Sequence, residues 1–251
     1  MRSQEDERRE RIVMDDHPND FYHIVLTNFN CGLYSTKGRT RRRLAASRDP
    51  NSWFEHRCSL FERFTLPSMA NQSSQDFEWR ILVDIETPDN HRKKLESYKY
   101  SNIKLVENAK IFPEDVGDKD WLITTRIDND DAFHKDALKT VQEKIARTDE
   151  TAFYFGLGYS LWKRNLALWG YNQNMFPSFI AKVPESGEIK TVYCATHRKL
   201  YKVAKNYQLL KGSPMWLMVV HERNISNKHR GRPMDRVPER LSDFSVLLPE
   251  D

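Results

Sequence analysis

The chain has 251 residues, of which 39% are hydrophobic, 12% aromatic and 30% charged. We expect a folded globular protein, because disordered chains are poor in aromatic residues. The net charge of +4 is small for a dedicated nucleic-acid binder. Only 9 residues are glycine, which argues against a nucleotide site built from a glycine-rich loop. The longest apolar run, Trp216–Val220, is too short to span a bilayer.

Residues 1–20 are mostly charged and contain no apolar segment of the kind found in secretory signals. We therefore predict a charged, flexible N-terminal head. The three cysteines, Cys31, Cys58 and Cys194, lie far apart and suit neither a zinc cluster nor a disulfide framework. Reduced thiols are typical of the cytoplasm, which is the predicted location.

Strands and helices alternate in the first half of the remaining chain. Runs of β-branched and aromatic residues predict strands over 21–28, 78–84, 102–107 and 120–128. Helices are expected over 53–72, 88–100 and 132–147. The first is capped by Asp49 or Ser52 and broken or kinked at Pro67, and the third is capped by Asp131. This alternation is typical of an α/β fold with a mainly parallel central sheet and helices on both faces.

The second half is richer in strands and predicts a smaller antiparallel sheet. Strands are expected over 152–162, 165–171, 178–183 and 215–221, and a helix over 191–205. No linker rich in Gly or Ser divides the chain. We therefore predict a single domain over residues 21–230, followed by a C-terminal tail over 231–251.

Three predicted strands end in polar residues, at 27–30, at Asp84 and at 128–131. The carboxyl ends of neighbouring parallel strands share an edge, where ligands bind in open α/β sheets. Asp128 and Asp130 point the same way in an extended backbone, and paired carboxylates suit Mg²⁺ or Mn²⁺. A turn followed by a helix cap explains the same residues equally well.

Two further features each have a functional and a structural interpretation. His221 ends the last predicted strand and completes a metal site with the carboxylates, or is a hydrogen-bonded structural histidine. The Arg39–Arg43 cluster binds phosphate, or is a solvated loop.

Several segments together resemble a known family. They are, in chain order, Thr27–Asn30, Trp53–Phe64, Leu66–Met69, Phe77–Asp84, Thr87-Pro88 and Thr125–Ala132. The Asp-x-Asp at the end of a buried strand, after three earlier βα units, resembles the GT-A-fold glycosyltransferases. More closely, residues 21–230 resemble the rhamnosyltransferase-like family of bacteria and their viruses. One departure is Asn28, where similar proteins often carry Arg.

The resemblance implies a GT-A-like domain with a donor site and a metal site. The implied donor-binding residues are Asn28, Asp84, Arg126 and Asp128, and the implied ligands of Mn²⁺ or Mg²⁺ are Asp128, Asp130 and His221, with Asp131 as a second choice. Within these sets, Asp84 would contact the nucleotide base and Asp128 the ribose and the metal. The smaller sheet would face the acceptor.

The implied activity is metal-dependent transfer of a sugar from a nucleotide-diphosphate sugar to a glycan or another hydroxyl acceptor. The donors dTDP-rhamnose and a UDP-hexose such as UDP-glucose both stay open, as does the choice between inversion and retention. The sequence shows no clear catalytic base, and His197 and Glu222 are the candidates. The location would be the cytoplasm of a bacterium or of a virus-infected host cell.

Two other classes of protein remain alternatives. The first is a metal-dependent nuclease that uses Asp84, Asp128 and Asp130, although nucleic acid is not an expected partner at this net charge. The second is a non-catalytic module that binds a nucleotide or a glycan.

Overall fold

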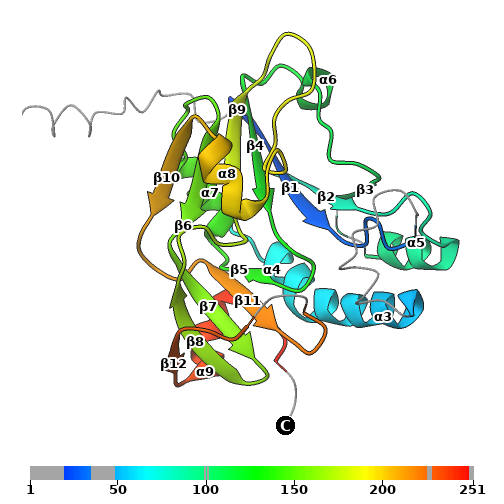
Figure 1. Cartoon of the computed structure of the whole chain (residues 1–251), viewed down its shortest axis with the longest axis vertical. Coiled ribbons are helices and arrows are strands. Elements are labelled where there is room, and N and C mark those ends of the chain that lie inside the picture. The colour runs from blue at the N-terminus through cyan, green and yellow to red at the C-terminus, as the bar shows by residue number, and fades with distance from the viewer. Residues whose placement is uncertain (1–19, 35–48, 99, 101, 225–227, 249–251) are drawn as a thin grey trace, which may run out of the picture.

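A large sheet forms the centre of the molecule (Figure 1). The computed structural model describes residues 20–34, 49–98, 100, 102–224 and 228–248. Within these residues, seven strands form the large sheet in the order β10-β6-β9-β4-β1-β2-β3. The Arg39–Arg43 cluster and residues 1–19 of the predicted head lie outside the described residues.

Most strands of the large sheet are parallel. They are β1 (Phe21–Asn28), β2 (Glu78–Leu82), β3 (Ile103–Val106), β4 (Trp121–Arg126), β6 (Thr151–Phe155) and β10 (Asn206–Leu210). The exception is β9 (Ser178–Lys182), which lies antiparallel between β4 and β6. The expected α/β fold with a mainly parallel central sheet is therefore confirmed.

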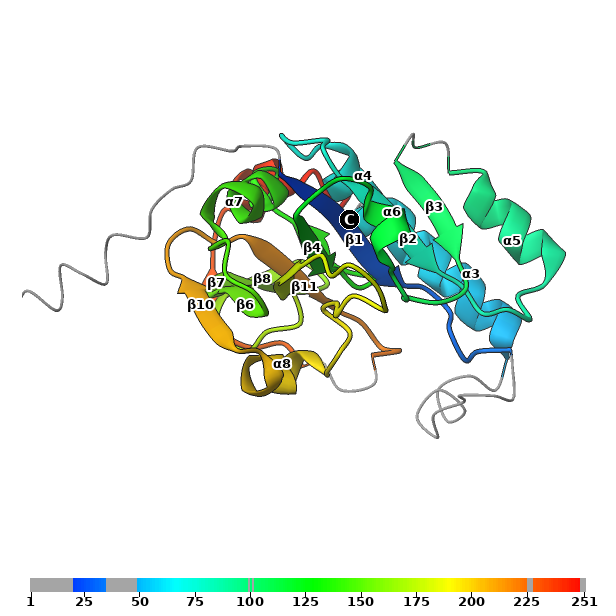
Figure 2. The ribbon, with the colours of Figure 1, turned by 90° about the horizontal axis from the view of Figure 1, so that it is seen from above.

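Helices cover both faces of this sheet (Figure 2). One face carries α3 (Pro50–Leu60), α4 (Leu66–Ala70), α5 (Asp89–Glu96) and α7 (Ala137–Lys144), and the other carries α6 (Pro113–Val116) and α8 (His197–Val203). Because side chains alternate along a strand, Val25 of β1 packs on the first face, and Ile24 and Leu26 on the second. No helix in the described ranges is both long and apolar enough to cross a bilayer.

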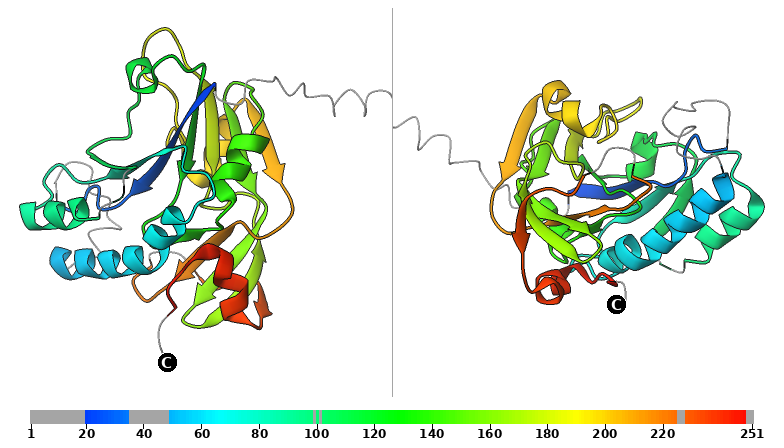
Figure 3. Two further views of the ribbon diagram at one scale, coloured as in Figure 1. Left: turned by 180° about the vertical axis from the view of Figure 1, so that it is seen from behind. Right: turned by 60° about the horizontal axis from the view of Figure 1, so that its bottom comes forward.

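A second sheet lies beside the large one (Figure 3). In the described part of the chain it has five strands in the order β12-β8-β7-β11-β5. They are β5 (Ala132–Phe133), β7 (Leu157–Trp162), β8 (Asn165–Gly170), β11 (Trp216–Val220) and β12 (Arg232–Met234). The pairing is antiparallel except between β7 and β11, so the smaller sheet is mostly antiparallel, as expected, with one parallel pair.

A single glycine takes the chain from one sheet to the other. The strand predicted over 152–162 is divided at Gly156 into β6 of the large sheet and β7 of the second sheet. The Gly156 N–H donates to the Leu210 carbonyl at 2.8 Å, and its carbonyl accepts from the Tyr171 N–H at 3.1 Å. The hydrophobic pattern is continuous through this point, and the sequence therefore predicted one strand.

The segment predicted to be a C-terminal tail, residues 231–251, contributes a strand to the second sheet. Residues 232–244 form β12, the short helix α9 (Val237–Leu241) and the turn η2 (Ser242–Phe244). Leu241 and Phe244 are buried against β7, β8 and β11 and the end of α3.

The helix predicted over 53–72 consists of three consecutive segments: α3, a π-helical turn η1 (Phe61–Thr65) and α4. Of the two proposed caps, Asp49 is the one observed, since its carboxylate accepts the N–H groups of Asn51 and Ser52 at 3.0 and 3.3 Å. Pro67 lies in the first turn of α4. Proline lacks an N–H and crowds the carbonyl four residues earlier, and the wider π turn accommodates this ring.

Two other predicted helices begin later than expected. Asp131 caps no helix: β5 follows it directly, and α7 begins after Asp136. The Asp131 carboxylate instead accepts the N–H of Val219 at 2.8 Å, so a tertiary contact outweighs the local capping preference. In the segment 191–205, α8 begins only at His197. The following strand β10 was not predicted, because as an exposed edge strand it lacks an apolar run.

Acid should destabilise the fold through His23, which is buried in β1. Its Nδ1 accepts from the Gln142 amide at 3.1 Å, and its Nε2 lies 2.8 Å from the Thr125 hydroxyl. Burial, followed by the charge of Arg147, lowers the pKa of His23 to about 3. Because the unfolded chain binds this proton more readily, stability is full above pH 6.5 and falls as the pH drops toward 3, by about 1.4 kcal/mol per pH unit.

Urea unfolding at several pH values measures this slope. The variant His23→Gln keeps a neutral polar side chain at the site and should flatten the slope between pH 6 and 4 by about 1.4 kcal/mol per pH unit. Equal slopes for the wild type and the variant would contradict the prediction.

Candidate active site at the carboxyl edge of the large sheet

The carboxyl ends of β1, β2 and β4 meet at one edge of the large sheet (Figure 1). After β4, the Asn129 amide donates to the Phe29 carbonyl at 3.0 Å. After β2, the Asp84 N–H donates to the Asn30 side chain at 3.0 Å. Both contacts join the ends of β2 and β4 to the residues that follow β1, so the predicted convergence of polar strand ends is confirmed.

Asp130 lies at the centre of a buried polar cluster, with its side chain 6% exposed. The Nε2 atom of His221, from the end of β11, is 2.9 Å from Asp130 Oδ2. Arg57 of α3 donates from Nη1 to the same oxygen and, at 3.1 Å, to Asn129 Oδ1. Burial alone would raise the pKa of Asp130, but the charges of Arg57 and His221 outweigh it and lower this pKa to about 2. The carboxylate is therefore ionised at neutral pH.

Both ring nitrogens of His221 have polar neighbours. Its Nδ1 accepts the backbone N–H of Arg223 at 3.2 Å, and its Nε2 lies 2.9 Å from the Asn224 amide as well as from Asp130. On the far side, His56 of α3 places its Nε2 3.3 Å from His221 Nδ1. Burial, and then the charges of His221 and nearby arginines, lower the pKa of His56 to about 4.

A second polar cluster consists of Arg126, Asp128 and His197. Arg126 holds both oxygens of Asp128 from Nη2 at 2.8 Å. Its Nη1 lies 2.8 Å from His197 Nδ1. A guanidinium only donates, so Nδ1 of His197 accepts and the proton of its neutral ring lies on Nε2. Burial and the charges of Arg126 and Arg198 lower the pKa of His197 to about 4.

Two buried acceptor atoms at this edge have no hydrogen-bond partner among the described residues: Asn28 Oδ1 and Asp131 Oδ2. Burial, and then the charges of Asp130 and Asp128, raise the pKa of Asp131 well above its usual value.

Asp84 organises the turn after β2. Its carboxylate accepts the N–H of Tyr34 at 3.2 Å and the N–H of Glu86 at 3.0 Å. Its backbone carbonyl accepts the Thr87 hydroxyl at 2.5 Å. The neighbouring Ile85 is 67% exposed, which leaves an apolar side chain beside the carboxylate.

The contacts at this edge do not fit the expected metal site. Asp128 is held by Arg126, and Asp130 Oδ2 already accepts from Arg57. His221 Nε2 already contacts Asp130 Oδ2 and the Asn224 amide, both at 2.9 Å. Within the described ranges, no three His, Cys, Asp or Glu side chains are arranged to hold a metal ion. The structure thus brings Asp130 and His221 together, but places a guanidinium where the cation was expected.

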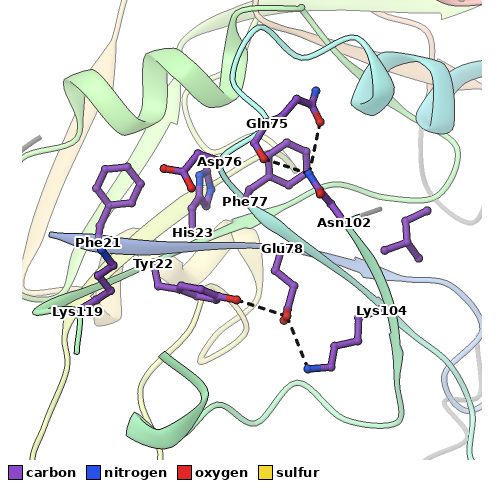
Figure 4. A pocket seen from close by; sticks show the side chains of 11 residues that line it. Phe21, Tyr22, His23, Gln75, Asp76, Phe77, Glu78, Asn102, Lys104 and Lys119 are labelled. Atoms are coloured by element: carbon purple, nitrogen blue, oxygen red, sulfur yellow. Dashed lines mark hydrogen bonds and ion pairs between the residues drawn. The ribbon is translucent and has the colours of Figure 1, made fainter. Parts of the chain in front are cut away.

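A groove of about 710 Å³ lies at the opposite ends of β1, β2 and β3 (Figure 4). Its polar side chains largely bind one another: Tyr22 donates to Glu78 at 3.5 Å, Lys104 lies 3.6 Å from Glu78, and Asn102 donates to the Gln75 carbonyl at 3.1 Å. Ligands of open α/β sheets bind at the carboxyl ends, so we place the active site at the other edge.

Sequence reasoning missed Arg57, His56 and Asn224. Arg57 follows Trp53 by four residues and precedes Phe61 by four, so it interrupts the apolar stripe of its helix. A charged residue on a buried helix face is the signal that identifies it. Asn224 follows His221 by three residues, and its side chain accepts the His221 N–H at 2.6 Å. Short polar turns of this kind are too common to predict from sequence.

The fold and the candidate site define an α/β protein with a buried polar cluster at the carboxyl edge of a mainly parallel sheet. Residues 30–233 match the model of the family described as "Putative rhamnosyl transferase". This match covers most of the chain, so the protein belongs to that glycosyltransferase family, as the sequence resemblance implied.

Solved structures of S. aureus TarS are similar at low sequence identity. TarS 1–349 matches with a TM-score of 0.42 and 14% identity, over 79% of this chain and 60% of that chain. Its complex with UDP matches with the same TM-score and coverage, at 13% identity. The protein thus spans about 60% of the length of the TarS chain. None of the curated proteins matches the sequence.

Proposed function

We propose that the protein transfers a sugar from a nucleotide-diphosphate sugar to a hydroxyl group of a glycan or a similar acceptor. The observation that carries this proposal is the buried cluster of Asp130, Arg57 and His221, which come from three separate elements to the carboxyl edge of the sheet. Membership of the family supports sugar transfer as the reaction at this edge.

We place the donor along the edge from Asp84 to Asp130. Asp84 lies at the nucleotide end, where the exposed Ile85 offers apolar surface to a base. Asp128, oriented by Arg126, is the proposed ribose contact. Asn28 Oδ1, buried without a described partner, is an acceptor for a hydroxyl group of the donor.

The proposed reaction forms one bond and breaks another at the anomeric carbon. The acceptor oxygen bonds to this carbon, while the bond from the carbon to the diphosphate oxygen breaks and its electron pair leaves with the diphosphate. Positive charge builds up on the sugar ring, as in glycoside hydrolysis. Negative charge builds up on the leaving group, and fixed positive groups at the site stabilise it.

The proton of the acceptor hydroxyl needs a base. Of the two candidates, His197 is unsuited to this role, because its Nδ1 accepts from Arg126 and its Nε2 carries the proton. Glu222 follows His221 directly and is exposed, so its carboxylate is accessible to an acceptor. We therefore keep Glu222 as the proposed base.

Release of nucleotide diphosphate tests the function. The protein is incubated with UDP-glucose, dTDP-rhamnose and other nucleotide sugars, once with EDTA and once with Mn²⁺ or Mg²⁺. We expect release from at least one donor, and the two conditions decide whether a divalent cation is needed. Cleavage of DNA without release from any donor would favour the nuclease alternative. Binding of a nucleotide sugar without turnover would favour a non-catalytic module.

A further inference from the structure

We propose that Arg57 binds the diphosphate of the donor and supplies there the positive charge expected of a divalent cation. This inference rests on the proposed function and assigns a residue to it. Arg57 lies on α3, contacts Asn129 and Asp130 after β4, and has a side chain that is 11% exposed. Its guanidinium is thus a fixed charge at the edge where the donor is placed.

The position of the guanidinium is built by three neighbours. Nη1 donates to Asp130 Oδ2 and to Asn129 Oδ1 at 3.1 Å, two residues that directly follow β4. The ring of Trp53, one helical turn earlier, lies with its centroid 5.3 Å from the guanidinium carbon. An ion pair, a neutral hydrogen bond and a cation–π contact together hold the Arg57 guanidinium in place. They do not use all of its N–H donors.

The unpaired N–H donor of the Arg57 guanidinium indicates a ligand. Nε of Arg57 is buried and has no hydrogen-bond partner among the described residues. An arginine buried only for structure is expected to pair its donors, because an unpaired buried N–H lowers stability. The planar guanidinium matches phosphate oxygens with two parallel hydrogen bonds. A diphosphate at this edge would accept from Nε, the donor without a described partner.

Asp130 is the second observation that favours this assignment. Its Oδ2 atom accepts from Arg57, lies 2.9 Å from His221 Nε2 and lies 3.4 Å from the Asn224 amide. An oxygen that accepts from a guanidinium and has two further nitrogen atoms within 3.4 Å has little room for a metal ion. The same oxygen is well placed to hold Arg57 in position while the diphosphate binds.

Nucleotide binding in EDTA tests the proposal separately from turnover. Calorimetry compares UDP with uridine, and dTDP with thymidine, so that the diphosphate is the only difference within each pair. The wild type should prefer the diphosphate. Arg57→Gln should weaken diphosphate binding by about 10- to 100-fold, the usual effect of losing a hydrogen bond to a charged group, and leave nucleoside binding unchanged. Arg63→Gln, on the following π turn and bonded to the Leu247 carbonyl, is the matched control and should bind like the wild type.

A second variant covers the case in which Arg57→Gln does not fold. Arg57→Lys keeps the charge but loses the planar fork, and should also reduce the preference for the diphosphate. An unchanged preference in the folded variant would overturn the proposal. The proposal would also be overturned if the preference for the diphosphate appeared only with Mn²⁺ and was equally strong in the wild type and the variant. If the wild type binds neither UDP nor dTDP, the proposed function fails, and this inference fails with it.

Discussion

Replacing Asp130 by Asn should lower the rate of sugar transfer by about 100-fold or more, because a displacement of about 1 Å at a reacting centre has effects of this size. The carboxylate orients two side chains, Arg57 and His221, which reach it from α3 and β11. An amide lacks the charge that holds both groups. Steady-state release of nucleotide diphosphate by Asp130→Asn, compared with the wild type, measures the loss.

The control is a carboxylate far from the site. Asp235 is 85% exposed and lies 3.6 Å from Arg240, so Asp235→Asn should leave both transfer and stability unchanged. Full activity of Asp130→Asn would show that Asp130 is not part of the reacting centre.

Comparing Asp130→Asn with a double variant separates the effect on stability from the effect on function. Removing one partner of a buried ion pair typically lowers stability by about 3–5 kcal/mol, since the other charge stays buried and unpaired. The double variant Arg57→Gln with Asp130→Asn leaves no unpaired charge. It should unfold at higher denaturant concentration than Asp130→Asn alone, yet remain inactive. Recovery of activity together with stability would mean that the pair is only structural.

The location of the site could be predicted from the sequence, because strand ends are encoded locally. Apolar runs that end in Asp or Asn identified the carboxyl ends of β1, β2 and β4, and the parallel sheet brings these ends together. The proximity of Asp130 and His221, 91 residues apart, was implied by the family resemblance, and the 2.9 Å contact confirms it although β11 belongs to the second sheet. The roles of these residues in binding stay predictions.

The contacts within the site could not be predicted in the same way. Arg57 was assigned to a helix without a role. Its place in the apolar stripe indicates that it faces the core, but the sequence does not show which side chains it contacts there. Asp131 was assigned to a helix cap, which is the local preference of Asp, but the Val219 N–H lies within reach only in the folded chain. The guanidinium beside Asp130 is likewise a tertiary feature, and the expected metal ligands were inferred without it.

Adding one methyl group at Gly158 should destabilise the protein by about 3 kcal/mol, the upper range for overpacking a core. Gly158 lies in β7, and a Cβ there would overlap the indole of Trp216 in β11. Trp216 cannot move away easily. Its ring is fully buried and stacks on Phe176 at 5.2 Å, and its Nε1 donates to the Phe155 carbonyl at 3.1 Å. For a chain of this length, the melting temperature should fall by roughly 6–12 °C.

Thermal unfolding of Gly158→Ala tests this, with Gly156→Ala as the matched control two residues earlier. A Cβ at Gly156 would meet Leu209 Cδ1 and the Leu210 carbonyl at 3.5 Å, an ordinary contact, so this variant should unfold close to the wild-type temperature. A normal melting temperature for Gly158→Ala would show that β7 and β11 can separate at little cost. The result also bears on the active site, because β11 begins at Trp216 and His221 directly follows its last residue. A shift of the indole that displaces this strand should weaken the His221–Asp130 contact, so we expect Gly158→Ala to lose transfer activity well below its melting temperature, and Gly156→Ala to keep it.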